Sequence, residues 1–220
     1  RAMIQRVRAI RRVLKAEAWD LVVLIDNPGL NFHFARVAKA AGRRVLYYIA
    51  PQVWAWRPGR MKWIQRRVDH VVVILPFEPD LYRRAGVRCT FVGHPLLDSV
   101  APQYDRATLR KEFGFDESAR VVGLLPGSRR SEVEMLLPVL LKAAARLVAA
   151  EPGTHFILAQ ASSIDDNLIQ GLLQHSPVPV RVAHDRASEV MALSDVLFIA
   201  SGTATLQAAV VGTPMVLLYK

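Results

Sequence analysis

Short, almost purely apolar runs recur along this 220-residue chain, separated by segments long enough to form helices. Continuous Val, Ile and Leu without polar alternation is typical of parallel strands that helices cover on both faces. The spacing predicts βαβ units, and hence two successive α/β domains with doubly wound, Rossmann-like parallel sheets. The expected strands are LVVLI (21–25), VLYYIA (45–50), VVVIL (71–75), CTFVG (89–93), VVGLL (121–125), FILAQ (156–160), VRVA (180–183), VLFIA (196–200) and MVLLY (215–219).

The interval between the two groups of strands predicts a domain junction. Residues 94–118 contain two prolines and no strand-like run. We therefore expect an N-terminal domain over 1–98, a linker over 99–118 and a C-terminal domain over 119–220. In doubly wound sheets ligands bind beyond the carboxyl ends of the strands, so these ends are where chemistry is expected.

Composition narrows the cellular setting. Cys89 is the only cysteine, which excludes an intramolecular disulfide and the usual four-ligand zinc site, so a reducing cytoplasm is expected. The first residues do not have the pattern of a signal peptide. The longest uncharged run, 196–219, is interrupted by Gly, Ser, Thr and Pro at strand-helix-strand spacing, and we expect it to be core, not a membrane span.

Positive charge is concentrated in the first half of the chain. Residues 1–98 carry 18 Lys and Arg against 7 Asp and Glu, a balance of +11, whereas residues 99–220 carry 11 against 12. Residues 2–14 place apolar side chains at helical spacing with arginines on the remaining faces, which predicts a basic amphipathic helix. This one-sided charge indicates an anionic partner: acidic lipid, nucleic acid or a phosphorylated substrate.

Two turns at strand ends are candidates for phosphate binding. In the first, PGSR, Gly127 permits close backbone approach, Ser128 can cap the following helix and Arg129 offers a planar donor fork. The second offers hydroxyls and backbone amides at another helix start. Each alone is also what an ordinary capped helix needs, but the pair favours binding of a nucleotide sugar. The candidates in the second turn are Ser201, Gly202, Thr203, Ala204, Thr205 and Gln207.

Asp26 stands where the first buried strand ends. A carboxylate placed there faces a cleft, and partial burial would raise its proton affinity and suit it to general-base work. An Asx-turn that stabilises the loop is an equally good interpretation. His94 and His184 also fall at strand ends, where a histidine more often bonds the loop than reacts. Because no histidines have metal-ligand spacing and no D-x-D pair occurs, we expect a reaction without metal or cofactor.

Six motifs occur in a fixed order: IDNPGLNF, YYIAPQVWAWR, ILPFE, FVGHPLLD, LLPGSRRSEVE and SGTATLQAAVVGTPMVLLYK. Together they resemble the lipid-A-disaccharide synthase family, glycosyltransferases of the GT-B architecture, over essentially the whole chain. The resemblance implies two Rossmann-like domains that face a cleft. It also implies a fragment, because the family has a glycine-rich strand and loop before this start and a further segment after this end.

The resemblance implies an inverting hexosyltransferase of lipopolysaccharide biosynthesis. Diacylglucosamine would pass from UDP-2,3-diacylglucosamine to 2,3-diacylglucosamine 1-phosphate (lipid X), giving the β-1′,6-linked lipid A disaccharide 1-phosphate and UDP. Asp26 matches the family's general base, Arg129 a donor-phosphate contact and 201–207 the nucleotide-binding helix start. Gln207 departs from the family pattern, in which glutamate often accepts both ribose hydroxyls. The residues expected to contact the acceptor or a membrane are Asn31, Gln52, Trp54, Trp56 and Arg57.

The loop PQVWAWRPGR (51–60) carries the membrane hypothesis. Its tryptophans, or Trp63 beyond it, are expected against acyl chains or at the interface of the inner membrane's cytoplasmic face, with the nearby arginines at lipid phosphates. The competing interpretation packs Trp54, Trp56 or both into the core. Two other functions stay open: another GT-B enzyme, either a peptidoglycan N-acetylglucosaminyltransferase or a UDP-sugar epimerase, and a basic nucleic-acid-binding module. We expect no nucleic-acid partner, because no RNA- or DNA-binding signature accompanies the charge.

Overall fold

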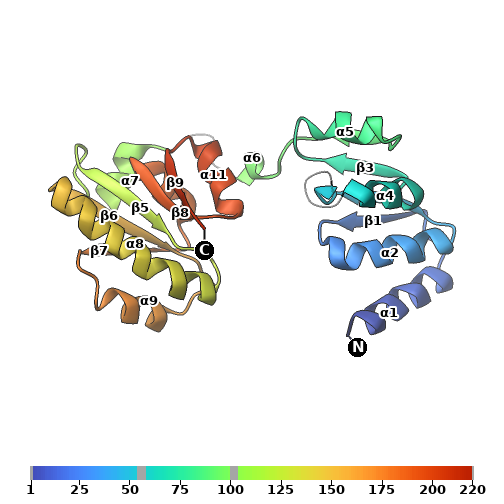
Figure 1. The fold of residues 1–220 in the computed structure, drawn as a ribbon, viewed down its shortest axis with the longest axis horizontal. Helices are drawn as coiled ribbons and strands as arrows, with labels where there is room; N and C mark the ends of the chain where they lie inside the picture. The colour runs from blue at the N-terminus through green and yellow to red at the C-terminus, as the bar shows by residue number, and fades with distance from the viewer. Residues whose placement is uncertain (1, 54–57, 100–103, 220) are drawn as a thin grey trace. The chain divides into compact units, whose positions relative to one another are not determined.

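The computed structural model describes residues 2–53, 58–99 and 104–219, which form two compact units (Figure 1). Unit 1 spans Arg1–Pro95 and unit 2 spans Leu96–Lys220. Every apolar run expected to be a strand forms one, and all the strand pairs are parallel, so the predicted α/β class with parallel sheets is confirmed.

Unit 1 contains a four-stranded sheet in the order β1-β2-β3-β4. The predicted basic amphipathic helix is its first element. The strands are β1 (Leu21–Ile25), β2 (Arg44–Tyr48), β3 (His70–Val73) and β4 (Cys89–Phe91), and the helices are α1 (Ala2–Ala16), α2 (Pro28–Ala40), the short 3-10 helix η1 (Pro58–Arg60), α4 (Met61–Arg67) and α5 (Glu78–Arg84).

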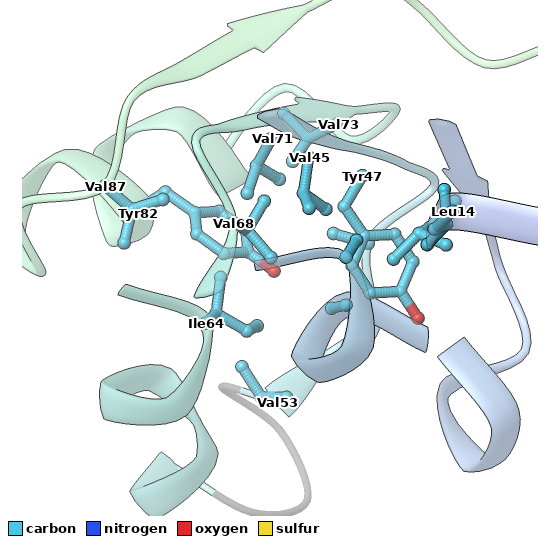
Figure 2. Packing of buried hydrophobic residues seen from close by; sticks show 14 residues of the cluster. Leu14, Val45, Tyr47, Val53, Ile64, Val68, Val71, Val73, Tyr82 and Val87 are labelled. Atoms are coloured by element: carbon cyan, nitrogen blue, oxygen red, sulfur yellow. The ribbon is translucent and has the colours of Figure 1, made fainter. Parts of the chain in front are cut away.

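The strand order of unit 1 places its helices on one face of the sheet. When successive strands add in one direction, right-handed connections bring every crossover to the same side. The core lies on that side, where Val45, Tyr47 and Val71 are fully buried (Figure 2). On β1, side chains of the opposite phase are open to solvent: Leu21, Val23 and Ile25 are 45, 51 and 57% exposed. Within the described residues, β1 is therefore covered on one face only.

Unit 2 contains a five-stranded sheet in the order β7-β6-β5-β8-β9, which is doubly wound because the direction of strand addition reverses between β5 and β8. Separate apolar clusters line its two faces. The elements are α6 (Leu96–Ser99), α7 (Arg106–Glu112), β5 (Arg120–Leu125), α8 (Arg130–Ala150), β6 (Thr154–Gln160), α9 (Asp166–Leu173), β7 (Val180–His184), α10 (Ala187–Leu193), β8 (Val196–Ala200), α11 (Thr203–Val211) and β9 (Met215–Leu218). Helix α7 lies within the predicted linker 99–118, and it packs on α10 of unit 2.

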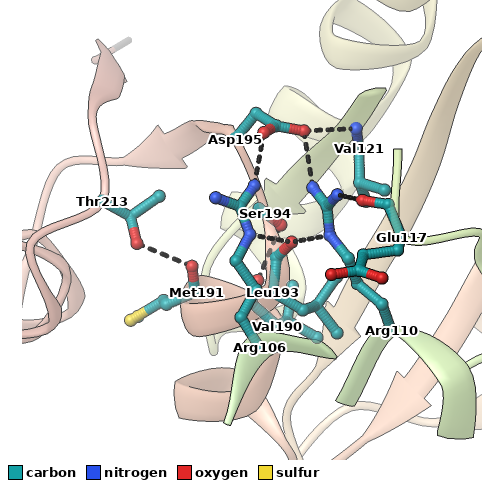
Figure 3. Close-up of polar contacts among 10 residues, drawn as sticks. All are labelled: Arg106, Arg110, Glu117, Val121, Val190, Met191, Leu193, Ser194, Asp195 and Thr213. Atoms are coloured by element: carbon teal, nitrogen blue, oxygen red, sulfur yellow. Dashed lines mark hydrogen bonds and ion pairs between the residues drawn. The ribbon is translucent and has the colours of Figure 1, made fainter. Parts of the chain in front are cut away.

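In both units, an aspartate forms the same pair of hydrogen bonds between the amino ends of two neighbouring strands. Asp69, just before β3, donates its N–H to the Val45 carbonyl at 2.8 Å and accepts the Val45 N–H through its carboxylate at 2.7 Å. Asp195, just before β8, donates its N–H to the Val121 carbonyl at 2.8 Å. Its carboxylate accepts the Val121 N–H, also at 2.8 Å (Figure 3). Each of the two carboxylates also forms an ion pair with a basic side chain. In each unit, the aspartate side chain thus adds one hydrogen bond to those that join the neighbouring strands.

Candidate active-site pockets

Unit 2 has a pocket of about 290 Å³ at the carboxyl ends of its strands, beside the point where the strand order reverses. Open α/β sheets bind their ligands at this position. The two turns that the sequence singles out for phosphate binding lie far apart along the chain, yet both reach this pocket. The predicted residues that line it are Gly127, Ser128, Arg129, Ser201, Gly202, Thr203 and Ala204.

The PGSR turn closes around a carboxylate. Gly127 has a φ of 115°, and a Cβ at this position would lie 2.5 Å from Oε2 of Glu132. The same oxygen accepts the N–H groups of Ser128 and Arg129 at 3.1 and 3.2 Å, while Oε1 accepts Arg129 Nη1 at 2.6 Å. Burial alone would raise the pKa of Glu132, but these hydrogen bonds hold it below its usual range. An anion therefore already engages the donors of the turn.

Ser128 does not cap the helix, which corrects the expectation from the sequence. Helix α8 begins at Arg130 with Arg129 as its N-cap residue, so Ser128 lies one position too early. Glu132 instead accepts the N–H groups of Ser128 and Arg129, since a glutamate in the first turn can reach back to the residues before the helix. The Ser128 carbonyl accepts the Ser163 hydroxyl at 2.8 Å, which ties the turn to the segment after β6.

The second turn presents the amino end of α11 to the pocket. Gly202 is the N-cap residue, and the following Thr203 and Ala204 line the pocket with it. The Thr205 hydroxyl donates back to the Gly202 carbonyl at 2.7 Å. Gln207 lies in a neighbouring pocket of about 390 Å³, where its amide donates to the Ser188 hydroxyl. The two pockets share residues of the segment after β7.

Sequence reasoning missed three polar residues of the unit 2 pocket: Glu132, Gln160 and Asp185. Gln160 ends β6 and donates its amide to the Ile164 carbonyl at 2.9 Å, which orders the segment after the strand. Asp185 follows β7 with a φ of 55° and donates its N–H to the Gln160 carbonyl at 2.8 Å. Both lie at carboxyl ends of strands, so the rule that located the two turns would also have found them.

Unit 1 has its own pocket of about 360 Å³, again at the carboxyl ends of its strands. Asp26 and Gln52 line it with exposed side chains, and Arg60 contributes a cation. Glu78 also lines this pocket although it is only 2% exposed, and its carboxylate accepts the Leu75 N–H at 3.0 Å. Asn31 is different, because it is 7% exposed and lies against the turn at Asp26.

Trp63 belongs to the edge of the unit 1 core. Its ring meets the Phe32 ring edge-on with centroids 4.4 Å apart, and the Arg67 guanidinium lies 4.8 Å from the Trp63 centroid. Arg60 lies 5.1 Å from the centroid of Phe32. Arg60, at the end of the 51–60 loop, and Arg67, beyond it, therefore cover aromatic rings. Trp54, Trp56 and Arg57 lie outside the described residues.

Within residues 2–53, 58–99 and 104–219, no group of three or more His, Cys, Asp or Glu is arranged to hold a metal ion. Across the same described segments, no helix is both long and apolar enough to cross a membrane.

The fold is shared with solved enzymes of the GT-B class. A UDP-GlcNAc 2-epimerase from Neisseria meningitidis, bound to UDP-GlcNAc, matches with a TM-score of 0.65 and 13% identity over 98% of this chain and 64% of that chain. The MnaA–UDP structure from S. aureus matches with a TM-score of 0.67 and 10% identity over 100% of this chain and 63% of that chain. At these identities the likeness shows the fold alone.

The sequence relatives are much nearer. Proteins named lipid-A-disaccharide synthase from Trichlorobacter lovleyi and Geobacter sulfurreducens are 47% and 49% identical over 211 residues, which is 96% of this chain and 55% of each relative. The chain thus spans about half the length of the curated relatives it matches. The family described as lipid-A-disaccharide synthetase matches residues 1–220. The resemblance seen in the motifs is confirmed, and the chain belongs to the lipid-A-disaccharide synthetase family.

Proposed function

We propose that the protein transfers 2,3-diacylglucosamine from its UDP derivative to 2,3-diacylglucosamine 1-phosphate, forming the β-1′,6-linked disaccharide 1-phosphate and UDP. The observation that carries this proposal is the meeting of the PGSR turn and the α11 start in one pocket of unit 2. Two sets of donors around a volume of about 290 Å³ suit the diphosphate of a nucleotide sugar. The names of the relatives supply the substrate class.

The chemistry divides between the two pockets. Asp26 takes the proton from the acceptor's 6-hydroxyl, the oxygen forms a bond to the anomeric carbon, and the bond from that carbon to the diphosphate breaks on the opposite face. UDP then leaves with the electron pair. Arg129 and the N–H groups at the start of α11 stabilise the negative charge that grows on the leaving group. These groups perform the task without a metal ion, so we propose no cofactor.

The test of the base is Asp26→Asn in the intact enzyme, assayed by formation of disaccharide and release of UDP. Turnover should fall by at least 10³-fold because an amide cannot accept the proton at this step, while the Kd for UDP stays within twofold. Asp20→Asn is the matched control, since Asp20 is an exposed aspartate at the opposite end of β1. Near-normal turnover in Asp26→Asn would remove Asp26 from the role.

Another UDP-sugar reaction is the second candidate, because the solved relatives in fold include UDP-GlcNAc 2-epimerases. Incubation with UDP-GlcNAc separates the two proposals. Epimerised product without any disaccharide from the diacylated substrates would replace the transferase proposal. Tight binding to single-stranded RNA with no affinity for UDP would instead favour the nucleic-acid module that the basic half suggests.

We further propose that unit 1 binds the cytoplasmic face of an anionic inner membrane as a peripheral membrane protein. The charge balance of +11 in residues 1–98 supports this, as do Met3 and Ile4, which are 49 and 57% exposed on the basic helix α1. Binding to anionic vesicles should fall steeply with salt.

A variant with Trp54→Ala and Trp56→Ala tests the 51–60 loop: unchanged vesicle affinity and acceptor KM would favour the core-packing interpretation of these residues.

A further inference from the structure

Unusual backbone conformations gather at the strand ends that line the two pockets. Among the described residues, non-glycine residues with positive φ are Asp26 (46°), Asn27 (38°), Ile49 (52°) and Asp185 (55°). Asp26 and Ile49 line the pocket of unit 1, and Asp185 lines that of unit 2. A β-branched residue such as Ile49 is rarely found in this region. Such conformations persist only where their surroundings hold them, and they concentrate at functional sites.

Two buried side chains hold the turn at Asp26. The Asp26 carbonyl accepts Asn31 Nδ2 at 2.6 Å and the Tyr47 hydroxyl at 2.8 Å. Asn31 Nδ2 also donates to the Ile25 carbonyl at 2.8 Å, so one amide group bridges the last residue of β1 and the turn. The Asp26 N–H completes the fixation by donating to the Tyr48 carbonyl at 3.1 Å. The backbone of Asp26 is thus bonded on both sides.

Both side chains that bond the Asp26 carbonyl are buried. Tyr47 is fully buried in the unit 1 core and Asn31 is 7% exposed on α2. Burial raises the pKa of Tyr47, so its hydroxyl keeps its proton and remains a donor throughout the pH range in which enzymes work. The side chain of Asp26, in contrast, is exposed in the pocket. The Asp26 carboxylate is therefore accessible to a ligand, while the backbone of Asp26 is held by hydrogen bonds.

We infer that Asn31 and Tyr47 are positioning residues, which hold Asp26 in the left-handed conformation that aims its carboxylate into the unit 1 pocket. This inference rests on the proposed role of Asp26 as the general base. A base must lie within hydrogen-bond reach of the proton it removes, and small displacements of a reacting group are costly in rate. Loosening the turn should therefore lower kcat and leave the binding of UDP, which occurs in unit 2, unchanged.

The main variant is Tyr47→Phe, which removes one hydroxyl and keeps the ring. We expect kcat to fall roughly 5- to 20-fold, with the KM of the UDP donor within twofold, since one neutral hydrogen bond is lost. Tyr82→Phe is the matched control: Tyr82 is also fully buried in the unit 1 core, and its hydroxyl donates to the Pro51 carbonyl at 3.2 Å. It should lose similar stability but keep kcat within twofold. Equal kcat in the two variants would overturn the inference.

Two further variants test the same inference: Asn31→Ala, and Tyr47→Phe combined with Asp26→Asn. Asn31→Ala removes both amide bonds and should lower kcat further than Tyr47→Phe, in assays at a temperature where tryptophan fluorescence shows unit 1 folded. In an Asp26→Asn background, Tyr47→Phe should cause no additional loss, because the group that it positions is gone. Active Asp26→Asn enzyme would overturn the proposed base itself, whereas inactive Asp26→Asn with wild-type kcat in Tyr47→Phe and Asn31→Ala would overturn only the positioning role.

Discussion

At the scale of single residues, the Glu132 side chain lies directly against Gly127. The space that a Cβ at position 127 would fill already holds the Glu132 carboxylate, and that carboxylate binds the N–H groups of the turn. If UDP binds here as proposed, its diphosphate would meet these donors together with the Glu132 carboxylate that accepts from them. The turn can hold its shape before a ligand arrives, because Glu132 supplies the counter-charge internally.

Gly127→Ala tests this arrangement. The positive φ disfavours any side chain, and the new Cβ would force Glu132 or the turn to move, at a cost of about 1–3 kcal/mol in the free energy of unfolding. We expect the Kd for UDP, measured by titration calorimetry, to rise about tenfold. Gly171→Ala is the control, because Gly171 lies within α9 with no atom near its Cβ position; it should stabilise the protein slightly. Unchanged UDP affinity in Gly127→Ala would place phosphate binding elsewhere.

The sequence predicted which residues gather in the unit 2 pocket better than how each one acts. Gly127 and Arg129 carry recognisable signals, since glycine and arginine are the residues that a phosphate turn needs. Glu132 resembled an ordinary helix residue, and its reach back to the turn depends on where α8 begins. In unit 1, Asn31 was expected to meet an acceptor, but the structure shows it buried and bonded to backbone carbonyls. A motif cannot show this difference, because burial is decided by the whole unit.

At the scale of elements, the aspartate before β8 joins three parts of unit 2. Beyond its bonds to Val121, Asp195 pairs with Arg106 and with Arg110 Nη2 at 2.8 Å, both from α7 (Figure 3). Arg110 is 5% exposed, and its Nε donates to the Leu193 carbonyl at 3.1 Å at the end of α10. Helix α7 is thus attached through charged bonds to the amino ends of β5 and β8.

Replacing Arg110 with Met should lower the free energy of unfolding of unit 2 by roughly 2–3 kcal/mol, because the Leu193 and Glu117 carbonyls and the Asp195 carboxylate each lose one charged donor. Urea unfolding followed by far-UV circular dichroism measures the change. The exposed Arg146 on α8 provides the control: Arg146→Met should stay within about 0.5 kcal/mol of the unaltered protein. Equal losses in the two variants would show that α7 is attached by apolar packing alone.

The strand pattern was predictable at this scale because continuous apolar runs have few other uses in a chain of this composition. The exposed face of β1 was not. Apolar residues at Leu21, Val23 and Ile25 look the same in sequence whether helices cover one face or two. Which of these side chains the described residues cover depends on strand order, and order depends on contacts between segments that periodicity does not relate.

At the scale of the whole molecule, the two units have separate cores and separate optical signals. Each apolar cluster lies within one unit, and all four tryptophans are in unit 1, at positions 19, 54, 56 and 63. Tryptophan fluorescence therefore follows unit 1, whereas far-UV circular dichroism follows both. This distinction makes the acid response of each unit measurable.

Acid should destabilise both units through their strand-end aspartates. Burial alone would raise the pKa of Asp69, but hydrogen bonds from Lys39 and the Val45 N–H lower it; bonds from Val121 and Arg106 do the same for Asp195. A carboxyl whose folded pKa lies below its unfolded value of about 4 stabilises the fold above that pH and loses this contribution as pH falls. Asp69→Asn should therefore flatten the decline of the fluorescence-detected unfolding free energy between pH 5 and 3.

Asp195→Asn is the complementary variant. It should flatten the pH dependence seen by circular dichroism and leave the fluorescence-detected dependence unchanged, because Asp195 lies in unit 2. A change in the fluorescence signal as large as that of Asp69→Asn would show that the units unfold as one.

The two strand orders also set different conditions for assembly during synthesis. In unit 1 each new strand can pair with the one made just before it, as β2 does with β1, so the sheet can grow as the chain emerges. In unit 2, β5 is synthesised first but lies in the middle of the sheet. Its second neighbour, β8, is synthesised only after β6 and β7. Pairing across that distance is slow. Until β8 arrives, one edge of β5 stays open, and an unpaired strand edge of this kind is where a nascent chain is prone to aggregate.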